Sequence, residues 1–280
     1  MNNALSLGVV VNTYNQPDYL LRVLQGLGRQ SSRPSEILVA DDGSSAETRR
    51  ALEGWSKGQP TPCRHVWQEK QGFRRSRILN QAIAQATADY LVFLDGDSIP
   101  HPKFVADHQA LAERGCFIQG HRALIERRAA AFFGLSVFAS DRRRALWTGQ
   151  VRGLKHAFRW PRPLRRFRCD LRGVRGCNLA IWRSDLVRVN GYNEEFVGWG
   201  REDSELSLRL INSGVRRVDV RGWAICYHLW HPPVSREGLT ANDQLLAKAT
   251  NSQAITCSLG LAQHLPSTGA EARPARAEGL

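Results

Sequence analysis

Three short apolar runs constrain the fold of this chain more than any other feature. They are LGVVV at residues 7–11, EILVA at 36–40 and YLVFL at 90–94, and segments with helical character lie at 17–30, 45–55 and 76–86. Such runs are typical of strands buried on both faces, and strands that alternate with helices form parallel sheets. The sequence therefore predicts an α/β fold with a mostly parallel, Rossmann-like sheet flanked by helices, with a further short strand at 64–67.

Polar, turn-forming segments end all three runs: NTYN, DDGS and DGDS. Ligands of parallel sheets bind beyond the carboxyl ends of the strands, where these segments meet. Asp95 and Asp97 could together face a divalent cation and the phosphates of its ligand, or they could form an ordinary Asp-Gly turn. Asp42 could accept a hydrogen bond from a base or a ribose, or cap the next helix, and Tyr14 could stack on a base.

The segment GWGREDSELSLRL at residues 198–210 raises a second question. Glu202, Asp203 and Glu205 begin a helical pattern, and the helix macrodipole favours acidic residues at such a position. That explanation does not cover Trp199, which lies between two glycines. Two histidines, His228 and His231, follow in a tryptophan-rich segment, where each could be a core residue or a ligand of Mn²⁺.

The net charge of +13 indicates an anionic partner, such as a nucleic acid, a phosphorylated ligand or an acidic membrane surface. Much of this charge lies in residues 142–175, which contain twelve Lys and Arg residues against one acidic residue, Asp170. Aromatic side chains are interleaved with them: Trp147, Phe158, Trp160 and Phe167. This pattern fits a solvated face, docking on an anionic membrane or, less well, nucleic-acid binding.

The six cysteines form no CxxC pair, which indicates reduced thiols in a cytosolic protein. The sequence has neither a basic leader region at its start nor an apolar stretch of 18 residues. We therefore expect a cytoplasmic protein that is soluble or peripheral on the inner membrane. A nicotinamide-dependent oxidoreductase is disfavoured, because no GxGxxG follows the first predicted strand.

Four segments in order resemble the family 2 glycosyltransferases, which have the nucleotide-sugar-binding fold called GT-A. The segments are VVVNTYNQ, ILVADDGS, NQAIAQATADYLVFLDGD and GWGREDSELSLRL, and the resemblance covers about residues 5–235. The last segment is similar to the acceptor motif of β-1,4-galactosyltransferases and chondroitin-type polymerases. The resemblance implies an inverting, metal-dependent glycosyltransferase that uses a nucleotide sugar, with UDP as the expected nucleotide and Mn²⁺ or Mg²⁺ as the cofactor.

On the donor side, the resemblance assigns the nucleobase to Tyr14 and Asp42, with Asn12 beside them, and the ribose to Asp95. Many relatives have an arginine directly before the asparagine of the third segment, but here Leu79 precedes Asn80. We expect Arg77 or Arg74 to take its place in binding the nucleotide sugar.

The resemblance also assigns the metal and the acceptor. Asp97 would bind the metal, with His228 as the later metal ligand. Trp199 would stack on the acceptor sugar, Glu202 would hydrogen-bond it, and Asp203 would be the catalytic base. A sugar suits this segment, because it offers an apolar face to a ring and hydroxyl groups to carboxylates.

We thus expect a nucleotide-sugar-binding half at residues 5–120, an acceptor-binding half at 121–262 and a disordered tail at 264–280. The expected function is transfer of a hexosyl or N-acetylhexosaminyl group to a glycan or lipid-linked acceptor in cell-surface polysaccharide or lipopolysaccharide synthesis. The expected partners are the donor, this acceptor and an anionic membrane surface, without nucleic acid. The alternatives are a basic nucleic-acid-binding protein and a non-catalytic glycan-binding module.

Overall fold

A computed structural model describes residues 5–136 and 138–266. The first half alternates strands and helices: β1 (Leu7–Thr13), α1 (Pro17–Gly28), β2 (Glu36–Asp41), α2 (Ala46–Ser56), β3 (Cys63–Trp67), α3 (Arg75–Gln85) and β4 (Tyr90–Asp95). The strands lie side by side in the order β3-β2-β1-β4, and all of these pairings are parallel. The predicted strands and the predicted parallel sheet are confirmed.

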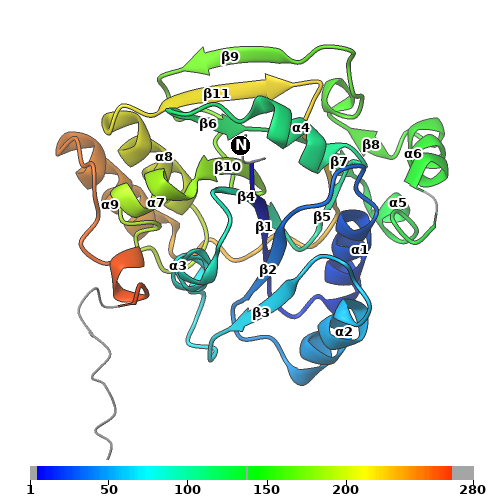
Figure 1. Ribbon diagram of the computed structural model, residues 1–280, viewed down its shortest axis with the longest axis horizontal. Helices are drawn as coiled ribbons and strands as arrows, with labels where there is room; N and C mark the ends of the chain where they lie inside the picture. The colour runs from blue at the N-terminus through cyan, green and yellow to red at the C-terminus, as the bar shows by residue number, and fades with distance from the viewer. Residues whose placement is uncertain (1–4, 137, 267–280) are drawn as a thin grey trace, which may run out of the picture.

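Four further strands extend this sheet beyond β4 (Figure 1): β10 (Asn178–Trp182), β6 (Cys116–Gln119), β11 (Arg216–Arg221) and β9 (Leu164–Arg168). Within the described residues the sheet has eight strands. Four of its seven pairings are parallel, and β10 and β9 run antiparallel to their neighbours. One continuous sheet therefore joins the two halves that the sequence predicted.

A smaller sheet lies beside the carboxyl end of β4. It has the order β5 (Ser98–Pro100), β12 (Ile225–Leu229), β7 (His121–Ile125) and β8 (Val151–Arg152). His228 of β12 is opposite Ser98 of β5, so this ladder brings a histidine from late in the chain next to Asp97. The small sheet thus connects the second half of the chain to the end of β4.

Helices cover both faces of the large sheet. Val9 and Val11 of β1 belong to a core with α1, α2 and α4 (Phe104–Leu111), whereas Val10 belongs to a second core with α3, α7 (Arg183–Arg188) and α8 (Glu202–Asn212). This division follows from the alternation of side chains along a strand. Helix α1 begins at Pro17, a residue favoured at the first helical position, and buries a leucine stripe that faces the first core.

The basic segment 142–175 is divided among several elements of the fold, and most of its cations are exposed. It includes most of α6 (Phe138–Trp147), β8, the 3₁₀ turn η1 (Leu154–His156) and the edge strand β9. Four of its twelve cations pair with carboxylates, namely Arg152 with Glu126, Arg159 with Asp107, Arg165 with Glu113 and Arg168 with Asp170. None of the described helices is long and apolar enough to cross a membrane.

The chain stays ordered further toward its end than the sequence suggested. After α9 (Leu239–Asn251) and the turn η2 (Leu261–Gln263), the His264 ring lies 2.7 Å from Oε1 of Glu194, and Leu265 packs against the second core. The prediction of a disordered tail from residue 264 is therefore wrong for residues 264–266, because these side chains find partners on the folded body. Residues 267–280 lie outside the described part of the chain.

The short helix α5 (Arg127–Ala130) precedes α6 along the chain.

Candidate active site

The carboxyl ends of β1 and β4 form the centre of the site. Asn12 of β1 is opposite Asp95 of β4, and the N–H of Gly96 donates to the Asn12 carbonyl over 2.7 Å. A Cβ at position 96 would lie 2.9 Å from that carbonyl oxygen, so this turn requires glycine. Among the described residues, the buried Oδ1 of Asn12 has no hydrogen-bond partner. An unpaired buried acceptor of this kind is costly unless a ligand donates to it.

Asp97, His228 and His231 form a cluster that could hold a metal ion, and their ligand atoms all lie within 4.8 Å of one another. Nε2 of His228 is 3.4 Å from Oδ1 of Asp97, and Nε2 of His231 is 3.1 Å from Oδ2. Burial lowers the pKa of His228 to about 4, so its imidazole is neutral and able to act as a ligand. One carboxylate with two imidazoles is a donor set that suits Mn²⁺. The structure thus places both candidate histidines, His228 and His231, beside Asp97.

Tyr14 and Asp42 lie on the side of the site that the sequence assigned to the nucleotide. The Tyr14 ring is 44% exposed, and the Lys70 ammonium lies 3.6 Å from its centroid. Asp42 is buried, and it accepts from Gln68 Nε2 over 2.6 Å, from Lys70 Nζ over 2.9 Å and from the Arg74 N–H over 3.1 Å. Asp42 therefore holds the segment after β3 beside the Tyr14 ring.

Arg75, the first residue of α3, is the residue that the sequence analysis missed. Its Nη1 donates to Oε1 of Glu202 over 2.8 Å and to Oδ1 of Asp203 over 3.0 Å, and its Nη2 donates to Oδ1 of Asp95 over 3.3 Å. The side chain is buried between the end of β4 and the start of α8. One guanidinium thus joins three carboxylates that are far apart in the sequence.

Neither arginine nominated from the sequence takes this position. Arg77 contacts Gln68 over 3.5 Å, and Arg74 donates from Nε to the Gln71 carbonyl over 3.0 Å. One feature of the sequence could have identified Arg75. It lies four residues before Leu79, and residues four apart lie on the same face of a helix, here α3. An arginine one turn before position 79 can reach the region that an arginine at position 79 would reach.

Asp203 is held by a second donor. The N–H of Gly176 donates to Oδ2 of Asp203 over 2.8 Å, while Arg75 binds the other oxygen. A Cβ at position 176 would lie 2.4 Å from both the Asp203 carboxylate and the Arg75 guanidinium, so a side chain there would displace them. The Asp203 side chain remains 18% exposed, which leaves its carboxylate accessible.

Glu202 differs from Asp203 in its burial and its charge state. It is 5% exposed, and among the described residues its buried Oε2 has no hydrogen-bond partner. Burial and the charge of Asp203 raise the pKa of Glu202 to about 7, against the opposing effect of Arg75. Glu202 thus has one oxygen bound by Arg75 and one oxygen free to bond a ligand hydroxyl.

Trp199 lies in the loop before α8, with 40% of its side chain exposed. The loop has left-handed backbone at Gly198, Gly200 and Arg201, with φ values of 83°, 103° and 79°. Asn242 of α9 supports it by donating from Nδ2 to the Val197 carbonyl over 3.2 Å and to the Gly200 carbonyl over 2.9 Å. The ring therefore stands at the surface, next to the start of α8.

Two family models match the chain, one after the other, between residues 8 and 232. The model described as glycosyl transferase family 2 matches residues 8–160, and the model described as the N-terminal domain of galactosyltransferase matches residues 162–232. The second match includes Glu202, Asp203 and both histidines of the Asp97 cluster.

Curated relatives match over most of this chain but only part of their own length. Validoxylamine A glucosyltransferase from Streptomyces hygroscopicus subsp. limoneus is 30% identical, with 78% of this chain and 51% of the relative covered. Chondroitin synthase from Escherichia coli is 26% identical, with 82% and 36% covered. The chain thus spans about half the length of the first relative and about a third of the second.

Solved structures share the fold at low sequence identity. Residues 1–349 of S. aureus TarS in complex with UDP-GlcNAc match with a TM-score of 0.64 and 16% identity, covering 93% of this chain and 69% of that chain. The mannosyltransferase PcManGT from Pyrobaculum calidifontis, in complex with GDP-Man and Mn²⁺, matches with a TM-score of 0.54 and 21% identity, covering 90% and 64%. The fold is therefore the predicted GT-A fold, a mixed α/β architecture around a large central sheet.

Proposed function

The chain belongs to glycosyl transferase family 2, and on this premise we propose that it transfers a sugar from a nucleotide sugar, with UDP as the nucleotide, to an acceptor hydroxyl. The transfer inverts the anomeric carbon and depends on a divalent metal. The observation that carries the proposal is the position of Arg75, which bonds Asp95 at the end of β4 and both Glu202 and Asp203 at the start of α8. This contact brings a donor side and an acceptor side to one point.

Asp97, His228 and His231 would hold the metal, Mn²⁺ or Mg²⁺. Their donor atoms are close enough for one ion, and two imidazole donors beside a carboxylate favour Mn²⁺ of the two. A bound divalent ion would neutralise charge on the departing diphosphate. The residues of the chain arrange the two substrates around that position.

On the donor side, Tyr14 would stack on the base, and this requires either the ring face opposite Lys70 or movement of the Lys70 ammonium. The unpaired Oδ1 of Asn12 is free to accept from the nucleoside, and Asp95 would bind the ribose. Asp42 has its oxygens bound by protein donors, so its contribution is to position the loop that carries Lys70 beside Tyr14.

On the acceptor side, Trp199 would stack on the apolar face of a sugar, and Oε2 of Glu202 would accept from one of its hydroxyls. Asp203 would remove the proton of the attacking hydroxyl as the hydroxyl oxygen bonds the anomeric carbon. Arg75 and the Gly176 N–H hold the Asp203 carboxylate in a fixed orientation. One displacement with one base inverts the configuration.

We infer a glycan or lipid-linked acceptor of cell-surface polysaccharide or lipopolysaccharide synthesis, reached at the anionic inner membrane. Support comes from the surface around α6, where Trp147 is 93% exposed, Leu154 is 54% exposed and Phe158 is 42% exposed. Arg143 and Lys155 are exposed in the same part of the chain. Exposed apolar side chains beside cations are typical of interfacial membrane binding.

The test is a donor and acceptor screen. The full chain is incubated with Mn²⁺ and a panel of nucleotide sugars, release of the nucleoside diphosphate is measured, and the anomeric configuration of the product is read by NMR. We expect release with a UDP-sugar, stimulated by a saccharide acceptor, and a product of inverted configuration. A non-catalytic glycan-binding module would bind saccharides and release no nucleotide, and retention of configuration would contradict Asp203 as a single base.

A further inference from the structure

A stacked pair of histidines lies beside the proposed acceptor side. The rings of His121, at the start of β7, and His156, in η1, have centroids 4.3 Å apart and an interplanar angle of 12°. Buried nitrogens of this pair, Nε2 of His121 and Nδ1 of His156, have no hydrogen-bond partner among the residues that the structure describes. The pair is not part of the Asp97 cluster.

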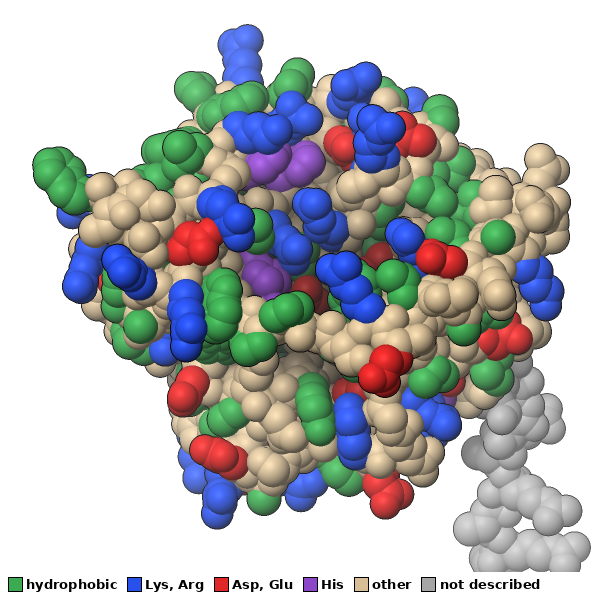
Figure 2. Space-filling model, turned by 180° about the vertical axis from the view of Figure 1, so that it is seen from behind, with side chains coloured by type: hydrophobic (Ala, Val, Ile, Leu, Met, Phe, Trp, Pro, Cys, Tyr) green, Lys and Arg blue, Asp and Glu red, His purple; other side chains and the backbone are tan. Residues whose placement is uncertain are grey.

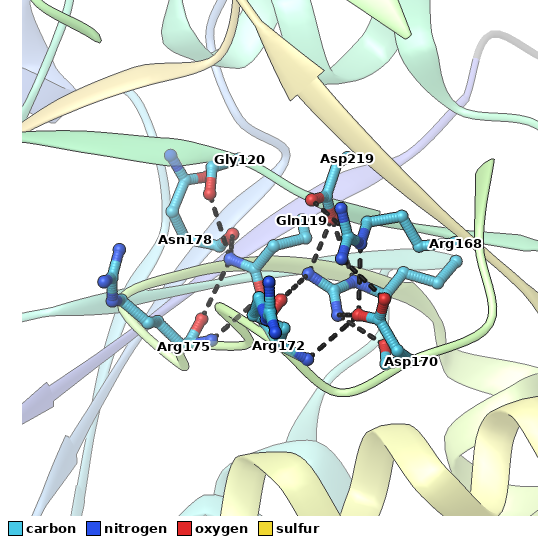
Figure 3. A network of polar contacts seen from close by, with 9 residues as sticks. Gln119, Gly120, Arg168, Asp170, Arg172, Arg175, Asn178 and Asp219 are labelled. Carbon is cyan, nitrogen blue, oxygen red and sulfur yellow. Dashed lines mark hydrogen bonds and ion pairs between the residues drawn. The ribbon is translucent and has the colours of Figure 1, made fainter. Parts of the chain in front are cut away.

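Figure 3 shows two amide side chains, Gln119 and Asn178, that join neighbouring chain segments. The Gln119 side chain makes two hydrogen bonds with the backbone of Arg175. Its Oε1 accepts from the Arg175 N–H over 2.9 Å, and its Nε2 donates to the Arg175 carbonyl over 3.1 Å. Asn178 donates to the carbonyls of His121 over 3.0 Å and Ala224 over 2.7 Å. The segment before β10 and the segment after Arg221 of β11 therefore both reach the start of β7.

Three exposed cations near the pair have no carboxylate partner within residues 5–136 and 138–266: Lys155, Arg175 and Arg221. The acidic residues of this region, Asp170 and Asp219, bind Arg168 and Arg217 instead, and Figure 3 shows the Arg175 guanidinium pointing away from that network. Figure 2 shows histidine side chains bordered by Lys and Arg side chains on a hollowed face. The cluster thus carries uncompensated positive charge.

The positive charge of the cluster helps to lower the pKa of both histidine rings. Burial, with the neighbouring His156 and the cations Arg221 and Arg175, lowers the pKa of His121 to about 3. Burial, with Lys155 and the same two arginines, lowers the pKa of His156 to about 4. Both imidazoles are therefore neutral, because a further positive charge beside these cations would be unfavourable.

The strand order places this cluster away from the nucleotide. Along the sheet the order is β2-β1-β4-β10-β6-β11, so Tyr14 and Asp42 lie at β1 and β2 whereas Gln119 and Arg221 lie at the ends of β6 and β11. Neighbouring strands are about 4.8 Å apart, so β11 is about 14 Å from β4. Arg175 precedes Gly176, whose N–H binds Asp203, and the cluster is thus on the acceptor side of the proposed base.

We propose that His121, His156, Lys155, Arg175 and Arg221 form a subsite for an anionic group of the acceptor, a carboxylate or a phosphate. The inference rests on the proposed function, because it names the substrate class of that site. Guanidinium groups bind both oxyanions through charge-assisted hydrogen bonds, and the unpaired imidazole nitrogens can add further bonds to the ligand. An acidic sugar, or a sugar phosphate, would sit with its charge here and its hydroxyl at Asp203.

The test measures binding without turnover. Metal-free protein is titrated at constant ionic strength with three probes: methyl glucuronide, glucose 6-phosphate and methyl glucoside. Binding is followed through the Cε1–H NMR signals of His121 and His156, assigned with His121→Gln and His156→Gln. The variants are Arg175→Gln and Arg221→Gln, and the matched control is Arg50→Gln, which removes an exposed arginine of α2.

We expect an anionic probe to shift both histidine signals, with affinity about tenfold weaker in each variant and unchanged in the control. Tighter binding of methyl glucuronide would identify the anionic group as a carboxylate, and tighter binding of glucose 6-phosphate would identify it as a phosphate. Equal shifts with methyl glucoside, or equal losses in Arg50→Gln, would overturn the inference. Failure of sugar transfer with anion binding intact would contradict the proposed function alone, and transfer with the same KM for neutral and anionic acceptors would contradict this subsite alone.

Discussion

Nη1 of Arg75 donates to Oδ1 of Asp203 over 3.0 Å and so connects the first residue of α3 to the start of α8. The same guanidinium bonds Glu202 and Asp95. A buried arginine with three carboxylates around it orients the proposed base.

Asp203→Asn should separate catalysis from binding. The amide keeps the shape of the side chain but cannot accept the proton, so turnover should fall by about 10²-fold or more. Calorimetry should show unchanged UDP-sugar affinity. Glu202→Gln and Trp199→Ala serve as comparisons, and both should mainly raise the acceptor KM. Full turnover in Asp203→Asn would mean that Asp203 is only an acidic residue at a helix start.

Asp97→Ala should abolish the metal dependence of nucleotide binding. The variant removes the one carboxylate of the cluster with His228 and His231. We expect UDP affinity, measured by calorimetry with Mn²⁺, to fall to the level seen with the parent chain in a chelator. Equal UDP affinity with and without Mn²⁺ in the parent chain would exclude a metal role for this cluster.

Arg75→Met should cost both stability and turnover. Removal of one partner from a buried ion pair typically costs about 3–5 kcal/mol, because the remaining carboxylates are left unpaired. Urea unfolding measures the stability, and kcat measures the orientation of Asp203. The control is Arg77→Met, two residues along the same helix, whose side chain contacts Gln68 over 3.5 Å. Equal effects of the two substitutions would show that Arg75 has no special role.

Glu202→Gln should change how stability depends on pH. The pKa of Glu202 is raised to about 7 in the folded chain from an ordinary 4.5, so the folded state binds the proton more tightly than the unfolded state. The free energy of unfolding should therefore decrease as pH rises from about 4.5 to about 7, and this contribution should be absent in Glu202→Gln. Urea unfolding of both proteins at intervals across pH 5–8 measures the difference, and parallel curves would contradict the prediction.

Binding to anionic vesicles should depend on the surface around α6. Co-sedimentation with phosphatidylglycerol vesicles should exceed that with phosphatidylcholine vesicles and weaken as salt is added, because each cation near such a surface contributes roughly 1 kcal/mol. Trp147→Ser should reduce the bound fraction, since Trp147 is 93% exposed. Equal binding to both lipids, or stronger retention on RNA, would favour the nucleic-acid alternative instead.

Much of the fold could be predicted from the sequence. The runs at 7–11, 36–40 and 90–94 became β1, β2 and β4, because continuous apolar segments have few ways to bury themselves other than in a two-sided sheet. The polar segments after these strands placed Asp95 and Asp97 at one edge, as parallel strands require. The acidic start of α8 was also confirmed.

Other features depended on contacts between residues far apart in the chain. The sequence does not reveal that Arg75, rather than Arg77 or Arg74, faces Asp203, because 128 positions separate the two residues and only the packing of α3 against α8 sets the direction of the side chain. The sequence left open whether the basic segment is a solvated face, and only the fold paired Arg152, Arg159 and Arg165 with carboxylates outside that segment.

The sequence by itself therefore determined the strands, the order of the motifs and the types of residue at the site, since these follow from local patterns of apolar and polar side chains. Only the tertiary structure decided which partners meet. It brought His231 as well as His228 to Asp97, left Lys155, Arg175 and Arg221 without a carboxylate partner among the described residues, and kept His264 on the folded body. The physical reason is that hydrogen bonds and ion pairs act over a few ångströms, so a partner far along the chain is determined only when the sheets and helices have packed.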